Sequence, residues 1–251
     1  MRSLPRLVTG VCITLSLGLL AAASLRPAAA PRAAAPGALP CVIVQEVETD
    51  AVQAYAMWIG EVNKTIAAKF QLDTYRHVML GESAGDDSGV VFAVTRGESF
   101  AALQAQEAAF EKEAALLDAR LHMREIRKLG ANVSYKAVRF DGVNPQAAVL
   151  NTKAVLSDEA AYLTALDGLR GLLDAHALKD VKINCYRVAA GRTEWSHLIS
   201  LNCPSRERRA ALMDALGGEA WAQDWINSIN KIRTVVGNGT YRDITPVAAT
   251  K

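Results

Sequence analysis

Apolar residues along the chain follow two spacings, one typical of helices and one typical of strands. Steps of three and four residues place apolar side chains on one helical face. Two such stripes occur in the first half, and their members are Val52, Tyr55, Ile59, Val62, Ile66 and Phe70, then Phe100, Leu103, Phe110, Ala114, Leu117 and Leu121. Short runs rich in β-branched and aromatic residues predict strands at 41–47, 74–80, 89–95 and 133–140. This half therefore predicts the order strand, helix, strand, strand, helix, strand.

The second half of the chain predicts the same order of elements. Strands are expected at 148–155, 181–188, 195–203 and 239–245. Ser157 is expected to cap a helix whose apolar stripe is Tyr162, Leu166, Leu169 and Leu173. Pro204 and Ser205 open a further helix, which Gly217 and Gly218 are expected to break or kink.

A sequence likeness accompanies the repeated order. Ile126, Lys128, Val133 and Arg139 return as Ile229, Lys231, Val236 and Arg242 at one constant offset. We therefore predict two copies of one unit, at 41–142 and 147–246, joined by the turn 141–146.

The element order of each unit predicts a four-stranded antiparallel sheet with two helices on one face, which is the ferredoxin-like arrangement. Apolar residues of the strands, among them Val91, Val133 and Ile199, cannot all point to one face of an alternating sheet, so the face without helices is also expected to be apolar. A two-layer unit must bury such a face, and the other unit of the same chain is the nearest partner. The prediction is an α+β fold in which two ferredoxin-like units pack sheet to sheet as an α+β barrel.

This element order resembles the dimeric α+β barrel superfamily, which includes antibiotic-biosynthesis monooxygenase-like domains and stress-responsive A/B barrels. The chain looks like a tandem form of that fold over about residues 40–246. The resemblance implies a barrel built from two ferredoxin-like units. It leaves the activity open, because the superfamily hosts oxygenases, isomerases, haem enzymes and proteins with no known activity.

The N-terminal residues differ from the rest of the chain. Arg2 and Arg6 precede an uncharged apolar run at 7–25, which predicts a secretory signal peptide over residues 1–25. An uncleaved membrane anchor is the alternative. Residues 26–40 are rich in Ala and Pro and are expected to form a tether. We therefore expect a periplasmic or secreted protein that meets a membrane only through an uncleaved leader.

Removing this leader changes the charge balance. Residues 1–35 carry four Arg and no acidic residue, so the remainder has 24 basic and 26 acidic residues, a net of −2. No cluster of Lys and Arg with interleaved aromatic residues occurs. Nucleic acid is therefore not expected as a partner.

Three cysteines remain after the leader, Cys41, Cys185 and Cys203. An exported protein can form disulfides, and Cys185 and Cys203 flank one predicted hairpin. They lie opposite each other if its loop centres near Glu194, and several residues out of register if it centres at Gly191. A disulfide and two buried thiols both remain open, and no metal site is predicted.

Candidate acid–base residues lie on predicted strands. His77 shares a strand face with Tyr75, and His197 shares one with Trp195. Either histidine can be an ordinary core residue, or can face a pocket as a general base or haem ligand. Chlorite-dismutase-like haem proteins use a tandem ferredoxin-like fold, but their residue pattern is not found around His176 or His197. No cofactor is predicted, and haem is kept as a minor alternative.

Aromatic residues offer a candidate pocket for an apolar ligand. Tyr55, Trp58 and Trp195 are the candidate ligand-binding residues, and ordinary core packing is the alternative. The motif GESAG at 81–85 matches the nucleophile elbow of α/β-hydrolases, but no helix is predicted directly after it. A hairpin loop is therefore the preferred interpretation of this motif.

Two functions remain open at the level of sequence. The first is an exported barrel protein that binds a small apolar ligand or serves as a structural or interaction module. The second is a cofactor-independent monooxygenase-like enzyme acting on a small organic substrate, with His77, Tyr75 or His197 as acid–base groups. An enzyme should bring at least two titratable groups into one pocket. Either protein is expected to be a monomer or a homodimer.

Overall fold

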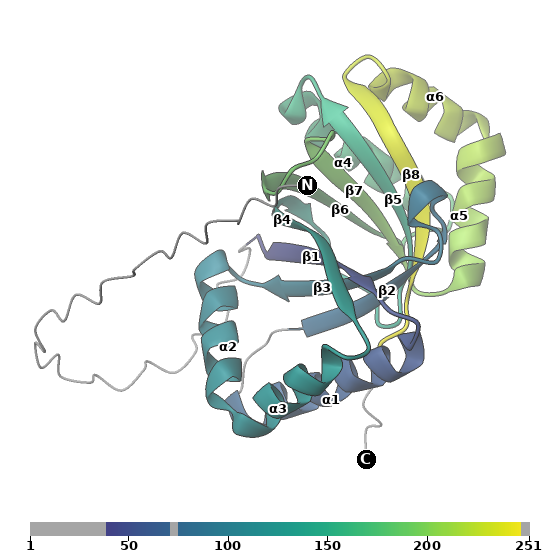
Figure 1. Ribbon diagram of the computed structural model, residues 1–251. Coiled ribbons are helices and arrows are strands. Elements are labelled where there is room, and N and C mark those ends of the chain that lie inside the picture. The colour runs from purple at the N-terminus through teal and green to yellow at the C-terminus, as the bar shows by residue number, and fades with distance from the viewer. Residues whose placement is uncertain (1–38, 71–74, 247–251) are drawn as a thin grey trace, which may run out of the picture. The chain divides into compact units, whose positions relative to one another are not determined.

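The barrel is the central feature of the molecule. The computed structural model describes residues 39–70 and 75–246, and these lie within one compact unit. In these residues eight strands pair antiparallel throughout and close into a barrel in the order β1-β3-β2-β8-β5-β7-β6-β4. Six α-helices lie on the outside of this barrel (Figure 1). The predicted signal peptide, and all of the predicted tether except its last two residues, lie outside the described residues.

The elements follow the order that the sequence predicts. The strands are β1 (Cys41–Glu48), β2 (Tyr75–Ser83), β3 (Val91–Gly97), β4 (Lys128–Phe140), β5 (Ala148–Leu156), β6 (Lys182–Ala190), β7 (His197–Cys203) and β8 (Arg233–Asp243). The helices are α1 (Val52–Phe70), α2 (Phe100–Lys112), α3 (Ala114–Met123), α4 (Glu159–Ala175), α5 (Arg206–Gly218) and α6 (Ala220–Ile229). A short 3-10 helix, η1 (Gly85–Asp87), lies in the β2–β3 connection.

Each half of the barrel has the ferredoxin-like strand order, which confirms the predicted fold. The first half runs β4-β1-β3-β2 and the second runs β8-β5-β7-β6. The two halves meet at two seams, β2 with β8 and β4 with β6, where edge strands form antiparallel pairs. The halves are thus joined by backbone hydrogen bonds and not only by packed faces. This pairing satisfies donors and acceptors that an open edge would expose.

The outer face of each half of the barrel carries a hydrophobic core. In the first half, Tyr55 and Ile59 of α1 pack with Val78 and Val91 of the sheet. In the second half, a larger core joins α4, α5 and α6 to strands β5, β6 and β7. Its fully buried members include Tyr162, Leu166, Leu169, Leu173, Ile183, Leu212 and Ile229. The helical stripes of the sequence are therefore the surfaces that cover the outside of the barrel.

Two helical boundaries differ from the predictions. The stripe at 100–121 forms two helices, because Glu113 adopts an extended conformation between α2 and α3. Glu219 makes the corresponding break between α5 and α6, next to the predicted glycine pair. Asp158, not Ser157, caps α4, since its side chain accepts a hydrogen bond from the backbone N–H of Ala161. No glycine or proline marks the first break, which explains why the pattern missed it.

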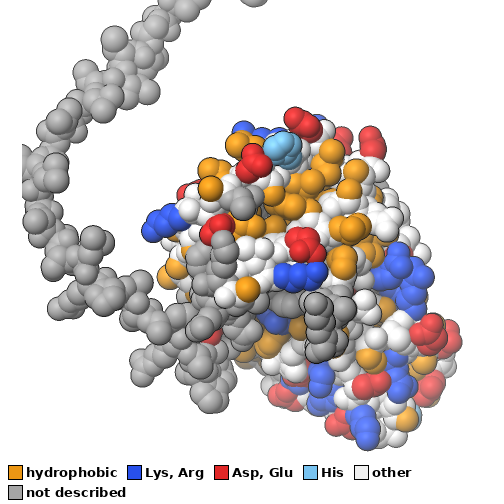
Figure 2. Space-filling model, turned by 90° about the horizontal axis from the view of Figure 1, so that it is seen from below, with side chains coloured by type: hydrophobic (Ala, Val, Ile, Leu, Met, Phe, Trp, Pro, Cys, Tyr) orange, Lys and Arg blue, Asp and Glu red, His pale blue; other side chains and the backbone are white. Residues whose placement is uncertain are grey.

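The outer surface is mixed in character. Figure 2 views the molecule from below Figure 1, the side on which α1 and α3 lie, and shows apolar side chains gathered among charged ones. Exposed large apolar residues on these helices are Met57, Leu117 and Leu121. Across the described residues no helix combines the length and the apolar character needed to cross a membrane. The expectation of a monomer or homodimer stays a prediction.

Candidate active site inside the barrel

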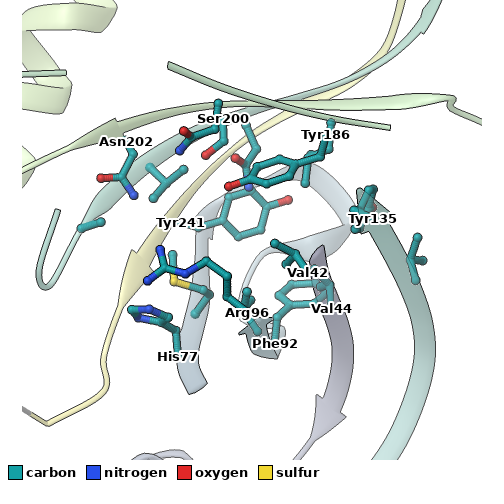
Figure 3. A pocket seen from close by; sticks show the side chains of 18 of the residues that line it. Val42, Val44, His77, Phe92, Arg96, Tyr135, Tyr186, Ser200, Asn202 and Tyr241 are labelled. Carbon is teal, nitrogen blue, oxygen red and sulfur yellow. The ribbon is translucent and has the colours of Figure 1, made fainter. Parts of the chain in front are cut away.

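The barrel interior holds a cavity of about 230 Å³, to which every strand contributes a side chain. The wall is mostly apolar, with Val42, Val44, Met79, Phe92, Val94, Val133, Val149 and Leu198 among its members. The polar side chains that reach the cavity include His77, Asp87, Arg96, Asn151, Lys153, Ser200, Asn202 and Asp243. Figure 3 shows several of these side chains converging from opposite walls. Because alternate residues of a strand face opposite sides, the strands that carry the outer cores also build this interior.

His77 and Asp243 form a pair on one wall of the cavity. His77 Nδ1 lies 2.6 Å from Asp243 Oδ2, and the side chain of Asp243 is only 4% exposed. Asp243 Oδ1 accepts a second hydrogen bond, from the backbone N–H of Thr245, at 2.9 Å. An ionised Asp243 accepts the Nδ1 proton of a neutral imidazole, which makes Nε2 the basic end of the ring. This is the orienting arrangement that a histidine base requires.

The seam between the two halves creates this pair. His77 belongs to β2 and Asp243 is the last residue of β8, whose register sets Met79 opposite Asp243. The hydroxyl of Thr245 holds the seam just beyond this pair, where it accepts the backbone N–H of Val78 at 2.7 Å. Neither half of the barrel contains both members of the pair. The histidine therefore acquires its carboxylate only when the barrel closes.

A second polar cluster also joins the two halves. Asp87, from η1, accepts hydrogen bonds from Lys153 Nζ and from the Tyr241 hydroxyl, each at 2.6 Å. Burial, followed by the hydrogen bond to Asp87, raises the pKa of Tyr241 far above its usual range. Tyr241 thus stays a neutral phenol that donates to Asp87. The Lys153 charge is balanced by Asp87 and lies 4.8 Å from the centre of the Trp195 ring.

Trp195 and Tyr135 form a third contact across the barrel. The indole Nε1 of Trp195 donates to the Tyr135 hydroxyl at 3.2 Å. Burial raises the pKa of Tyr135 to about 12, so the hydroxyl remains protonated near neutral pH. Tyr135 also meets Tyr186 edge to face, with ring centroids 6.5 Å apart. The aromatic part of the cavity is therefore a surface on which a flat ring can pack.

The predicted site residues are divided between the two faces of the barrel. His77 and Trp195 line the cavity. Tyr75 begins β2, and its side chain lies outside the described part of the chain. His197 is buried on the outer side, where Nε2 lies 2.7 Å from Glu159 Oε2 and Nδ1 lies 2.8 Å from Ser196 Oγ. The structure thus brings His77 and Trp195 to one cavity and keeps His197 away from it.

Tyr55 and Trp58 also lie away from the cavity. Both belong to the core between α1 and the outer face of the sheet, with ring centroids 6.0 Å apart. Arg127 covers them, with its guanidinium 5.5 Å and 5.0 Å from the two ring centres. These side chains fill the space between α1 and the sheet, which is the core packing that the sequence left as the alternative. They face outward because the helical stripe that carries them packs on the outside of the barrel.

The cysteines of the second half do not form the candidate disulfide. Cys185 pairs with Ile199 across the β6–β7 hairpin, whereas Cys203 lies four residues further along β7. The hairpin thus has the out-of-register geometry, and both cysteines are free thiols. Burial raises the pKa of each thiol to about 12, which keeps both protonated.

Among the histidines that could ligate a haem, His77 faces the cavity, whereas His176 and His197 do not. Both ring nitrogens of His197 already make short contacts, and His176 lies at the surface, stacked on Trp221. The cavity beside His77 is smaller than the roughly 300–1,000 Å³ of pockets that hold drug-sized ligands, and a haem is larger than such ligands. Within the described residues, no group of three or more His, Cys, Asp or Glu side chains is arranged to hold a metal ion.

Sequence reasoning missed most of the polar side chains of the cavity. Arg96 lies in phase with Phe92 and Val94 along β3, and Asp243 lies in phase with Tyr241 along β8. The sequence does show that each of these charged residues alternates with apolar residues and so shares their side of the strand. It does not show whether that side of the strand faces a cavity or a helix.

The chain resembles solved structures only at the level of the fold. No family model matches the chain, and no curated protein matches it by sequence. A monooxygenase candidate from Lactobacillus acidophilus NCFM aligns with a TM-score of 0.54 at 7% identity, covering 82% of this chain and 93% of that one. An anthrone oxidase-like protein aligns at 0.49 with 14% identity, covering 85% and 96%. Chlorite dismutase from Candidatus Nitrospira defluvii, in complex with imidazole, aligns at 0.46 with 11% identity, covering 80% and 90%. The first of these supports the ferredoxin-like α+β barrel fold, which this chain shares.

Proposed function

We propose that the barrel interior is an active site in which His77 removes a proton from a small, largely apolar organic substrate. The observation that carries this proposal is the His77–Asp243 pair, which faces the cavity with its carboxylate almost fully buried. A histidine held by a carboxylate is a common general base, because the pair fixes the tautomer and stabilises the imidazolium that forms. More than two titratable groups converge in one cavity, which favours an enzyme over a filled barrel.

The substrate class follows from the walls. Aliphatic side chains and the rings of Phe92, Tyr186 and Tyr241 suit a flat ring system. A proton is removed readily when the resulting carbanion is conjugated with a carbonyl group or an aromatic ring. The oxygenase form of this function adds dioxygen as a second substrate. One electron would pass from the carbanion to dioxygen, the two radicals would join in a C–O bond, and the peroxide would take the proton held by His77. The hydroperoxide would then lose water, with the second hydrogen of the same carbon, to leave a new carbonyl group.

Exchange of hydrogen with solvent tests the proton-transfer step without requiring oxidation. Incubation with 2-indanone, 2-tetralone and related aryl ketones in D2O is expected to label the acidic carbon, as followed by mass spectrometry. His77→Asn should lower the exchange rate at least 100-fold, since general-base catalysis contributes about 10²–10⁴-fold. His122→Asn is the matched control, because His122 is an exposed residue of α3. Equal rates for both variants would contradict the proposal.

A protein that binds a small apolar ligand without chemistry is the second candidate function. The observation that favours it is the mostly aliphatic wall of the cavity. Native mass spectrometry of the purified protein separates a retained small molecule from an empty cavity. A retained molecule that survives turnover conditions unchanged would favour binding over catalysis.

We also propose that the protein is exported. The support is the basic start and uncharged apolar run of residues 1–25, followed by the Ala- and Pro-rich segment. Cell fractionation with N-terminal sequencing of the mature protein tests this. Recovery in the soluble exported fraction with a new N-terminus is expected. Recovery in the membrane with the original N-terminus would indicate an anchor.

A further inference from the structure

Arg96 is a half-buried cation of the cavity wall that forms no ion pair with a described residue. It lies on β3, lines the cavity, and extends into it from the strand (Figure 3). Among the described residues no carboxylate lies within 4.0 Å of its guanidinium, and no hydrogen bond to that group is formed. Its guanidinium lies beside the ring of Phe140, whose centre is 5.4 Å from Arg96 Cζ. A charge in such a site favours an anionic partner.

Two cavity carboxylates are already engaged elsewhere. Asp243 is held by His77 and by the Thr245 backbone. Asp87 is held by Lys153 and Tyr241. Neither can turn to Arg96 without leaving its own partner unpaired, and a buried unpaired charge is costly.

Among the described residues, Glu46 is the remaining carboxylate that lines the cavity, and it lies further along the strands than Arg96. In the β1–β3 register Arg96 pairs with Val42 and Glu46 pairs with Phe92, so Glu46 is four residues further along β1. Four residues of strand span roughly 13 Å. The position beside Arg96 is therefore left for a bound molecule.

The contact with Phe140 leaves the donors of Arg96 available. A guanidinium that stacks on an aromatic ring keeps the N–H groups along its edge for hydrogen bonds. Carboxylates pair with this edge through two parallel hydrogen bonds. Arg96 is therefore suited to bind an organic carboxylate, and the Phe140 ring would keep the guanidinium oriented towards it.

The position of Arg96 relates it to His77. Val94 is directly opposite His77 in the β2–β3 pair, and Arg96 is two residues further on the same face. Such diagonal neighbours lie about 7–8 Å apart, within the span of one small molecule. We propose that the cavity binds a small aromatic or conjugated carboxylic acid, with its carboxylate on Arg96 and its acidic carbon or hydroxyl towards His77. The contact with His77 rests on the proposed function, whereas the contact with Arg96 does not.

A matched pair of probes tests the charge requirement. trans-Cinnamate and its neutral amide, cinnamamide, have nearly the same shape, and calorimetry on the purified protein measures both. The wild-type protein is expected to bind the acid at least tenfold more tightly than the amide. Arg96→Met should bring the two affinities within twofold of each other, while Arg96→Lys keeps part of the preference. Arg124→Met is the control, since Arg124 is an exposed residue at the end of α3.

Three results would overturn the inference. They are equal binding of acid and amide by the wild type, binding of neither at millimolar concentration, and a preference that survives in a folded Arg96→Met protein. Circular dichroism and thermal melting establish that each variant is folded. Inorganic phosphate should not displace cinnamate, because it makes no use of the apolar wall.

The outcome is separable from that of the proposed function. Arg96-dependent binding of cinnamate without His77-dependent exchange supports the acid site and contradicts the base. Exchange of neutral ketones by His77, with no preference for acids, supports the base and contradicts the acid site.

Discussion

Two histidine–carboxylate pairs, on opposite faces of the same barrel wall, show what makes one of them a candidate catalyst. His77 and Asp243 are 2.6 Å apart, and His197 and Glu159 are 2.7 Å apart. The first pair faces the cavity. The second lies under α4, where Ser196 occupies the other ring nitrogen of His197. The chemistry of the two pairs is nearly the same, so access to a ligand distinguishes them.

The largest expected effect is a difference in stability between substitutions on the outer face of the barrel and substitutions on its inner face. Leu166 is fully buried in the outer core, whereas Leu198 borders the cavity. Leu166→Ala should lower the free energy of unfolding by about 2–5 kcal/mol, because it leaves a new void among packed side chains. Leu198→Ala should cost about 1–2 kcal/mol, since part of that side chain already faces open space. Chemical denaturation measures both, and a larger loss for Leu198→Ala would reverse the assignment of the faces.

The next effect concerns catalysis at the inner pair. Asp243→Asn removes the charge that orients His77 and stabilises its protonated form. The rate of ketone exchange should fall roughly 100-fold, within the range of general acid–base contributions. Glu159→Gln alters the outer pair in the same way and should leave the rate within twofold of the wild type. If both variants lose activity equally, the two faces are not functionally distinct.

A smaller effect is expected in the pH dependence of stability at the outer pair. Hydrogen bonds from Arg187, and then from His197, hold the pKa of Glu159 below its usual range. A lowered carboxyl pKa adds stability that is complete above the unfolded-state pKa of about 4.3 and is lost as pH falls through the folded value. Glu159→Gln should therefore lower the free energy of unfolding by about 1 kcal/mol at pH 7. Melting curves from pH 7 to pH 3 should show this difference shrinking, and a constant difference would contradict the ionic contribution.

The smallest expected effect is that the two buried thiols of the second half do not react in the folded protein. Cys185 and Cys203 lie in the outer core, and burial raises the pKa of each to about 12. Neither should react with a thiol reagent at pH 8 until the protein is unfolded, when both should react. Mass spectrometry of alkylated peptides measures this. Recovery of a disulfide-linked peptide from the unreduced protein would show that the β6–β7 register is different.

The helices and strands were predictable because each helix or strand buries its apolar residues mainly against one side. The stripe of Tyr162, Leu166, Leu169 and Leu173 predicts a helix that packs on one side, and all four residues are fully buried there. Strand runs predicted the sheets in the same way. The break at Glu113 was not predictable, since no residue type with a special backbone preference marks it.

The candidate site was only partly predictable. His77 could be identified as a histidine on an apolar strand, but so could His197, and the sequence ranks them equally. Asp243 could not be connected with His77, from which it is separated by more than half of the chain. The sequence does not distinguish Arg96 from a surface residue, because a charged residue on a strand is usually solvated.

The sequence by itself determined the order of elements, the two ferredoxin-like units and the α+β class, since these depend on local periodicity and on burying apolar faces. The tertiary structure alone decided which strand face became the cavity wall and which residues meet there. The His77–Asp243, Lys153–Asp87 and Trp195–Tyr135 contacts each join one half of the barrel to the other. Such contacts depend on how the edge strands pair at the two seams, and strand register is a property of the closed barrel that local spacing does not encode.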